Sequence, residues 1–287
     1  MLASPSITRF LFTNIYSKLL FRAGLLCTIS LWAGIAQAQV KLSPMIIETQ
    51  SRRGQATGVI DITNTTDETF RARVYAESFT YDKEKGFQTI PSIANDLRPY
   101  LQFSPRELVV PPGTTRRVRM SARLAPNLPD GEYRAVIFTE PLKQSTVTDT
   151  KGVTTKVTTR IGSAFFVRKG DVRPNLTAET ARWNANNKRL QLLVRNTGKA
   201  STYSLIKWTL KQDGTVIKTG ESPSTGIVPD SDRYFTLNPS KKDELVLNPG
   251  TYQLSGEMMW GENKNKKSFN VNFTVPSTNL IRSLNRK

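Results

Sequence analysis

Residues 153–167, VTTKVTTRIGSAFFV, carry the pattern that most constrains the fold of this chain. The even positions hold Thr154, Lys156, Thr158 and Arg160. The odd positions are Val153, Thr155, Val157, Thr159 and Ile161. Period-two alternation carried by Val, Ile and Thr is typical of a β-strand. We therefore predict one long strand, with an apolar edge and a charged edge.

Two interpretations of this strand stay open from its residues alone. In the first it is the ordinary last strand of a β-sandwich. In the second it leaves the polar loop 144–152, projects beyond its own sheet, and offers unpaired backbone groups to another chain. Natural sheets normally blunt such an edge, so the rest of the chain has to decide between the two.

Short alternating segments fill the chain from residue 40 onward. In the first half we predict strands at 59–63, 70–75, 107–110, 115–120 and 134–140. Residues 81–100 interrupt the series and are predicted to be an excursion. Together with 153–167, these segments give about seven short strands with regularly spaced turns, which favours an immunoglobulin-like sandwich.

A second series of strands follows a predicted linker at 169–174. Its members are predicted at 180–184, 189–195, 204–212, 215–219, 233–237, 250–260 and 268–275. Asp213-Gly214 is the clearest hairpin signal, because this dipeptide tolerates the positive φ angles of a type I′ turn. No segment beyond residue 38 shows a sustained helical period. The predicted fold class is all-β, with two immunoglobulin-like β-sandwich domains in tandem.

The predicted organisation is a signal peptide at 1–38, a first domain at 39–168, a second at 169–276, and a basic tail at 277–287. The first segment has a basic lead, an apolar run at 23–35 that is short for a bilayer span, and Ala36-Gln37-Ala38 before the cut. It also holds Cys27, the sole cysteine. An exported chain without disulfides favours a bacterial periplasm.

The exported chain is strongly basic. Its net charge is +15 once the three basic residues of 1–38 are removed from the +18 of the whole chain. The bases are spread over alternate strand positions, so we predict no nucleic-acid partner. An anionic membrane surface, or an acidic or carboxylate-ended protein, fits this charge better.

The residue inventory argues against catalysis. The chain has no histidine, and no cysteine beyond residue 38, which removes the common zinc sites, thiol nucleophiles and His-based triads. The carboxylate pairs Asp82/Glu84 and Asp243/Glu244 lie in polar stretches typical of solvated loops, although a carboxylate-pair hydrolase stays a rival hypothesis. We predict no enzymatic activity, no metal and no cofactor. Four aromatic residues of the second domain are predicted to be core residues, not a carbohydrate platform: Trp183, Trp208, Tyr252 and Trp260.

The first domain resembles the PapD-like periplasmic chaperones of pilus and fimbria assembly. The residues that carry the resemblance are Phe103-Ser104-Pro105, Leu108, Pro112-Gly113, Val118-Arg119, Leu128-Pro129, Glu132-Tyr133-Arg134 and Arg160-Ile161. The resemblance implies a protein that is not an enzyme. Members of that family cap an unfinished pilin by lending it a strand and hand the subunit to an outer-membrane usher; such donor-strand complementation is a form of β-augmentation.

The same resemblance implies roles for individual residues. The lent strand is Val153, Thr155, Val157, Thr159 and Ile161, of which the first three would enter the groove of the client. The family binds the client's terminal carboxylate with two basic residues, but Ile46 and Gly162 stand at those positions here. Thr155 is a second departure, because the family prefers a larger apolar residue. Arg160 or Arg168 could replace the missing anchor, with plain surface arginine as the alternative.

The implied partners are pilin-like subunits, an outer-membrane usher, and a second copy in a self-capping dimer. The rival hypothesis is a structural or adhesive cell-surface protein that uses the same two sandwiches without a client.

Overall fold

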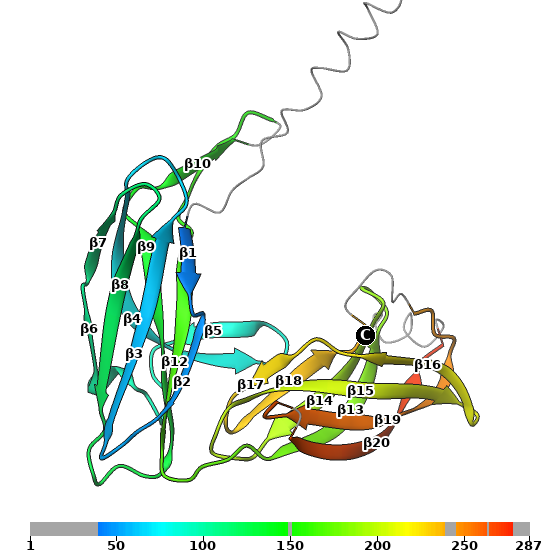
Figure 1. The fold of residues 1–287 in the computed structure, drawn as a ribbon. Helices are drawn as coiled ribbons and strands as arrows, with labels where there is room; N and C mark the ends of the chain where they lie inside the picture. The colour runs from blue at the N-terminus through cyan, green and yellow to red at the C-terminus, as the bar shows by residue number, and fades with distance from the viewer. Residues whose placement is uncertain (1–39, 149–150, 239–244, 263, 278–287) are drawn as a thin grey trace, which may run out of the picture. The chain divides into compact units, whose positions relative to one another are not determined.

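The computed structural model describes residues 40–148, 151–238, 245–262 and 264–277 (Figure 1). Within these ranges the regular structure is β-strand, apart from one 3₁₀ turn at Arg98–Tyr100. No helix in the described residues is long and apolar enough to cross a membrane. The predicted signal peptide, Asp243, Glu244 and nearly all of the predicted tail lie outside the described residues.

The strands up to residue 169 include two main sheets. The first has the order β1-β3-β8-β6, with β1 at Val40–Ser43, β3 at Gln55–Asn64, β8 at Thr115–Arg123 and β6 at Leu101–Ser104. The second has the order β2-β12-β9-β4-β5, and β7 also pairs with β4. Its strands are β2 (Ile46–Gln50), β12 (Ile161–Lys169), β9 (Gly131–Pro141), β4 (Phe70–Asp82), β5 (Gly86–Ile90) and β7 (Glu107–Val110). Read as strands A, B, E and D opposite C, F and G, this order is that of an immunoglobulin-like sandwich.

The strands after residue 175 form a second sandwich. One sheet has the order β13-β14-β18, with strands at Leu176–Asn184, Arg189–Asn196 and Ser231–Thr236. The other has the order β16-β15-β19-β20, with strands at Thr215–Glu221, Thr202–Gln212, Gly250–Trp260 and Asn265–Val275. The short β17 (Thr225–Ile227) also pairs with β15. The predicted all-β fold of two immunoglobulin-like sandwiches is therefore confirmed.

In each sandwich, a tyrosine near the start of one strand makes the same kind of side-chain hydrogen bond to the backbone. The hydroxyl of Tyr133, at the start of β9, donates to the carbonyl of Pro129 at 2.9 Å. The hydroxyl of Tyr252, at the start of β19, donates to the carbonyl of Asn248 at 2.9 Å. This is the tyrosine corner of immunoglobulin-like domains, which ties the incoming loop to the strand.

Alternation along β9 divides its side chains between two apolar clusters. Ala135 and Ile137 pack in the core between the two sheets, whereas Val136 and Phe138 lie in a separate aromatic cluster. Successive side chains of a strand point to opposite faces, so the second cluster lies on the outer face of the β2–β5 sheet. Both faces of this sheet are therefore apolar near β9 and β12.

Several local predictions are confirmed. Asp213 and Gly214 have φ angles of 49° and 78° and join β15 to β16, as a type I′ turn requires. Trp208 and Tyr252 are buried, and Trp183 and Trp260 pack against the second core. The excursion at 81–100 also contains β5, which the sequence pattern missed. The connection between the sandwiches is 170–175, because Lys169 still belongs to β12.

The prediction of a single strand over 153–167 is wrong. The strand is interrupted at 158–160, between β11 (Thr154–Val157) and β12. β12 pairs with β9 as far as Ile161 opposite Thr139. Continuing that register would set Thr159 opposite Pro141, which has no N–H to donate to a ladder. The pairing with β9 therefore ends at Ile161, and residues 158–160, which connect β11 to β12, are not part of a strand.

Candidate functional site

The predicted strand residues fall into two groups. Val153 and Val157 have 58% and 37% of their surface exposed, although both are large apolar residues. Thr155 and Thr159 are exposed as well. Ile161, by contrast, packs against the first core as part of β12. The structure thus anchors one end of the segment in the sandwich and leaves the other four side chains outside either core.

The exposed segment has a partner strand of its own. β11 pairs antiparallel with β10 (Ser145–Thr148), from Ser145 opposite Val157 to Thr148 opposite Thr154. The two make a separate two-stranded sheet; Figure 1 shows it extending past the end of the first sandwich. The hydroxyl oxygens of Thr148 and Thr154 lie 3.2 Å apart. One edge of β11 is therefore occupied.

The two positions where the resemblance implies basic residues differ in their surroundings. Ile46 begins β2, is partly exposed, and lies beside Ala164 of β12. Gly162 lies under the aromatic cluster: a methyl group there would come within 2.6 Å of Val136 Cγ2 and 2.9 Å of Phe138 Cε1. Contacts this short do not occur between relaxed side chains, so Val136 and Phe138 occupy the space that a lysine or arginine would need.

Arg160 lies on the outer face, beside this filled position. Its guanidinium is 3.9 Å from the ring centre of Phe138. Nη1 donates to Glu77 Oε1 at 2.8 Å and to the hydroxyl of Tyr75 at 3.0 Å. The side chain thus points away from Ile161, as strand alternation predicts.

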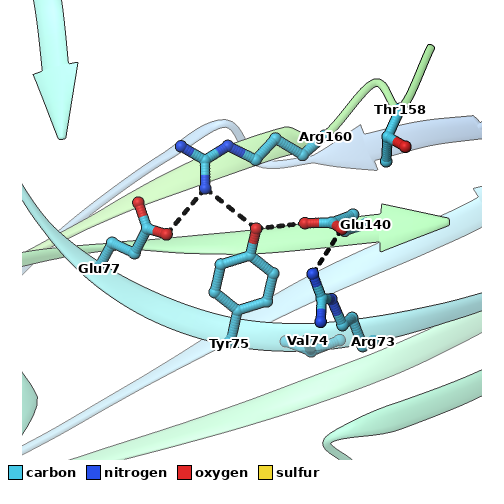
Figure 2. A pocket seen from close by; sticks show the side chains of 7 residues that line it. All are labelled: Arg73, Val74, Tyr75, Glu77, Glu140, Thr158 and Arg160. Carbon is cyan, nitrogen blue, oxygen red and sulfur yellow. Dashed lines mark hydrogen bonds and ion pairs between the residues drawn. The ribbon is translucent and has the colours of Figure 1, made fainter. Parts of the chain in front are cut away.

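A hollow of about 530 Å³ surrounds Arg160. Figure 2 shows a chain of polar contacts across it, from Glu77 through Arg160 and Tyr75 to Glu140 and Arg73. Tyr75 donates to Glu140 Oε2, and Arg73 Nη2 donates to Glu140 Oε1 at 2.7 Å. Thr158 and Val74 complete the lining. The hollow therefore presents two cations whose charges are partly balanced by two carboxylates.

These contacts shift the pKa values of Tyr75, Glu140 and Arg160. Burial, and then the hydrogen bond to Glu140, raise the pKa of Tyr75. The hydrogen bond from Tyr75 lowers the pKa of Glu140. Hydrogen bonds to Tyr75 and Glu77 raise the pKa of Arg160. At neutral pH the Glu140 carboxylate is consequently ionised and the Tyr75 hydroxyl is neutral.

Arg168 is placed quite differently. Its Nε donates to Glu132 Oε2 at 3.1 Å, while Nη2 donates to Glu48 Oε2 at 3.1 Å and to the carbonyl of Ser201 at 2.9 Å. Glu132 is fully buried, and its Oε2 also accepts from the backbone N–H and hydroxyl of Ser201. Arg168 is thus committed to a buried carboxylate.

Sequence reasoning missed the residues that surround Arg160. Tyr75 and Glu77 lie 85 and 83 residues away along the chain. Arg73 faces Glu140 only because β4 pairs with β9 in that register. Arg73 and Tyr75 share a face of the strand predicted at 70–75, but nothing local indicates which strand lies beside them. The carboxylates of Asp82 and Glu84 make structural contacts: Asp82 caps its own turn, and Glu84 binds Arg182.

Comparisons with known proteins give structural matches only. No family model matches the sequence, and no curated protein matches it. The class 5 fimbriae chaperone CfaA is similar at 14% identity and a TM-score of 0.47, over 83% of this chain and 100% of that one.

Two complexes give further matches. The chaperone–tip adhesion subunit complex CsuC–CsuE of Acinetobacter baumannii matches at 12% identity and a TM-score of 0.45, over 82% of this chain and 98% of that one. The Salmonella enterica SafA pilin in complex with the SafB chaperone matches at 11% identity and a TM-score of 0.41, over 84% of this chain and 98% of that one. With such values, function has to be inferred from the residues and geometry of this chain.

Proposed function

We propose that this protein is a periplasmic chaperone that stabilises pilin-like subunits by donor-strand complementation during assembly of a surface organelle. The observation that carries the proposal is β11, a strand outside both cores, with Val157 exposed at its end and Val153 exposed just before it. It is joined to β12, which is held in the sandwich by β2 and β9. A firmly based strand with exposed apolar side chains is what strand lending requires.

In this proposal Val153, Thr155 and Val157 enter the open groove of the subunit. Burial of the two valines, together with completed backbone pairing, supplies the binding energy without a cofactor or a chemical step. Val153 and Val157 mark the deep contacts, because Thr155 adds less apolar surface.

Co-purification tests this function. A tagged chain expressed in its own host is expected to retain a short fimbrial subunit from the periplasm, identified by mass spectrometry, and to be absent from the cell surface. The rival adhesive function predicts the reverse: surface exposure and no bound subunit. Recovery of a surface-exposed, client-free protein would overturn the proposal.

Arg160 is the better candidate for the client's terminal carboxylate. Its side chain is 35% exposed at the mouth of the hollow, whereas the guanidinium of Arg168 already donates to three oxygen atoms. A carboxylate at Arg160 would gain a charge-assisted hydrogen bond, in competition with Glu77. Val136 and Phe138 fill the space at Gly162, so a carboxylate contact at that position itself is blocked.

We expect Arg160→Ala to weaken binding of a peptide copied from the C-terminus of the co-purified subunit by about tenfold, because the contact is charged but partly solvated. The same peptide with an amidated end should bind both proteins alike. Arg73→Ala, on the other side of the hollow, is the matched control. Titration calorimetry measures the four affinities. An equal loss for the free and the amidated peptide would rule out Arg160 as the carboxylate contact.

An usher would need a surface away from the lent strand. A second hollow, of about 520 Å³, lies on β3, β8 and β6, with Val59, Phe103 and Met120 among its walls. Val59 is 39% exposed, and Arg119 lies opposite it in the pairing of β3 with β8. Aromatic residues, methionine and arginine, which are all present in the lining of this hollow, are enriched at protein interfaces relative to the rest of the surface. We propose this hollow as the usher-facing surface.

We expect Val59→Asp to lower recovery of the purified outer-membrane usher in detergent pull-downs by at least about tenfold, because a charge would be buried in an apolar contact. Capture of the subunit should be unchanged. Thr63→Asp adds the same charge on the same strand outside the hollow and serves as the control. Normal usher recovery with Val59→Asp would move the docking site elsewhere.

A further inference from the structure

β10 occupies the backbone edge that strand lending has to use. All four residues of β11 have partners in β10, from Ser145 opposite Val157 to Thr148 opposite Thr154. β10 and β11 pair with no other strand in the described part of the chain. β11 therefore has one free edge and one occupied edge, because a strand pairs along two edges.

A strand inserted into the gap of an unfinished sandwich pairs with client strands along both edges. This reasoning rests on the proposed function. With β10 in place, β11 can complete only one of those two ladders. We infer that β10 is an intramolecular cover for β11, and that subunit capture proceeds by exchange of β10 for a client strand.

The cover is weakly held, which suits it for exchange. It is four residues long, and an isolated two-stranded sheet is marginally stable in water. β11 is exposed along its whole length, so no core packing opposes separation. A cover of this kind blunts an edge that would otherwise pair with other chains. In a self-capping dimer, a second copy of the chain would cover this edge instead.

β10 covers the backbone of β11 but leaves its apolar side chains accessible. Val153 and Val157 remain exposed while the strands are paired. A client can therefore contact the valines first and displace β10 afterwards. The fraction of molecules with β10 released then limits the apparent affinity, and opening limits the capture rate at high client concentration.

A reversible disulfide between the strands tests this inference. Thr148→Cys with Thr154→Cys replaces a facing pair whose hydroxyl oxygens are 3.2 Å apart, and the exported chain has no other cysteine. The matched control is Thr251→Cys with Thr274→Cys, a facing pair at 3.5 Å in the second sandwich. The probe is the subunit identified by co-purification, purified, unfolded in guanidinium, and diluted into each chaperone.

We expect the oxidised 148/154 variant to capture the subunit at least about tenfold more slowly than the wild-type protein, and dithiothreitol to restore the full rate. The control disulfide should have no effect. Thr146→Pro, which removes a backbone donor from β10, should increase the rate. Slower hydrogen exchange of the β10 and β11 amides in the oxidised protein would confirm that the 148/154 disulfide holds the two strands together.

The outcomes separate the two hypotheses. If oxidised and reduced 148/154 proteins capture the subunit equally fast, β10 is not displaced and the inference is overturned, whereas the lending function stands. If neither the reduced variant nor the wild-type protein captures the subunit, the proposed function itself fails. A slower Thr146→Pro variant would also contradict the inference, because it would make β10 a support for β11.

Discussion

Replacing Val157 with aspartate is expected to abolish capture of an unfolded subunit while the chaperone itself stays folded. Val157 is exposed on β11, which belongs to neither sandwich core. In the free protein the new charge remains in water and costs little. In the complex it would enter an apolar groove, where an unpaired charge costs several kcal/mol, on the order of a hundredfold or more in affinity.

The measurement is co-elution of chaperone and refolding subunit on size exclusion, with thermal unfolding of the free protein as the check on folding. Thr154→Asp places the same charge on the opposite face of β11 and should retain most of the capture. If Val157→Asp lowered the unfolding temperature of the free protein instead, the residue would be part of a core. Strand lending by β11 would then be untenable.

Replacing Arg168 with methionine is expected to destabilise the protein by about 3–5 kcal/mol, because it leaves the buried carboxylate of Glu132 without its cation. The double variant Glu132→Gln/Arg168→Met is the control. It removes both charges and should recover much of the loss. Urea unfolding followed by far-ultraviolet circular dichroism, which reports both sandwiches, gives the free energy of unfolding for each variant.

The loss of stability caused by Arg168→Met should depend on pH in a defined direction. Burial already raises the pKa of Glu132, and Arg168 acts to lower it, so removing Arg168 raises this pKa further. A carboxyl with a higher pKa in the folded state binds more protons folded than unfolded, and stability then falls as pH rises through the window above 4.5. The Arg168→Met deficit should therefore be larger at pH 8 than at pH 5. A deficit that does not change with pH would mean that Glu132 is not the group left unpaired.

Local patterns predicted the elements of this fold well. Alternation located most strands, and the positive φ angles at Asp213-Gly214 followed from the turn chemistry of that dipeptide. The break at 158–160 was not predictable in this way, because it depends on Pro141 standing opposite Thr159 in a register set by long-range pairing.

The site was less predictable than the fold for the same physical reason. Val153 and Val157 could be singled out from alternation, since they recur at odd positions of a segment of β-branched residues. The partners of Arg160 could not, because Tyr75 and Glu77 arrive from a strand more than eighty residues earlier. The pairing of β11 with β10 also escaped notice, because a polar Ser/Thr segment is typical of a loop.

The three-residue link at 158–160 between β11 and β12 has a mechanical consequence. β12 pairs with β9 from Ile161 to Lys169 on one side and with β2 from Ala164 to Arg168 on the other. Ladder bonds run across the strand direction, so a pull along β11 loads all of them at once. A client strand drawn sideways from β11 breaks its bonds one after another. Force applied when a subunit is withdrawn will therefore separate client from β11 while the sandwich that carries the strand stays intact.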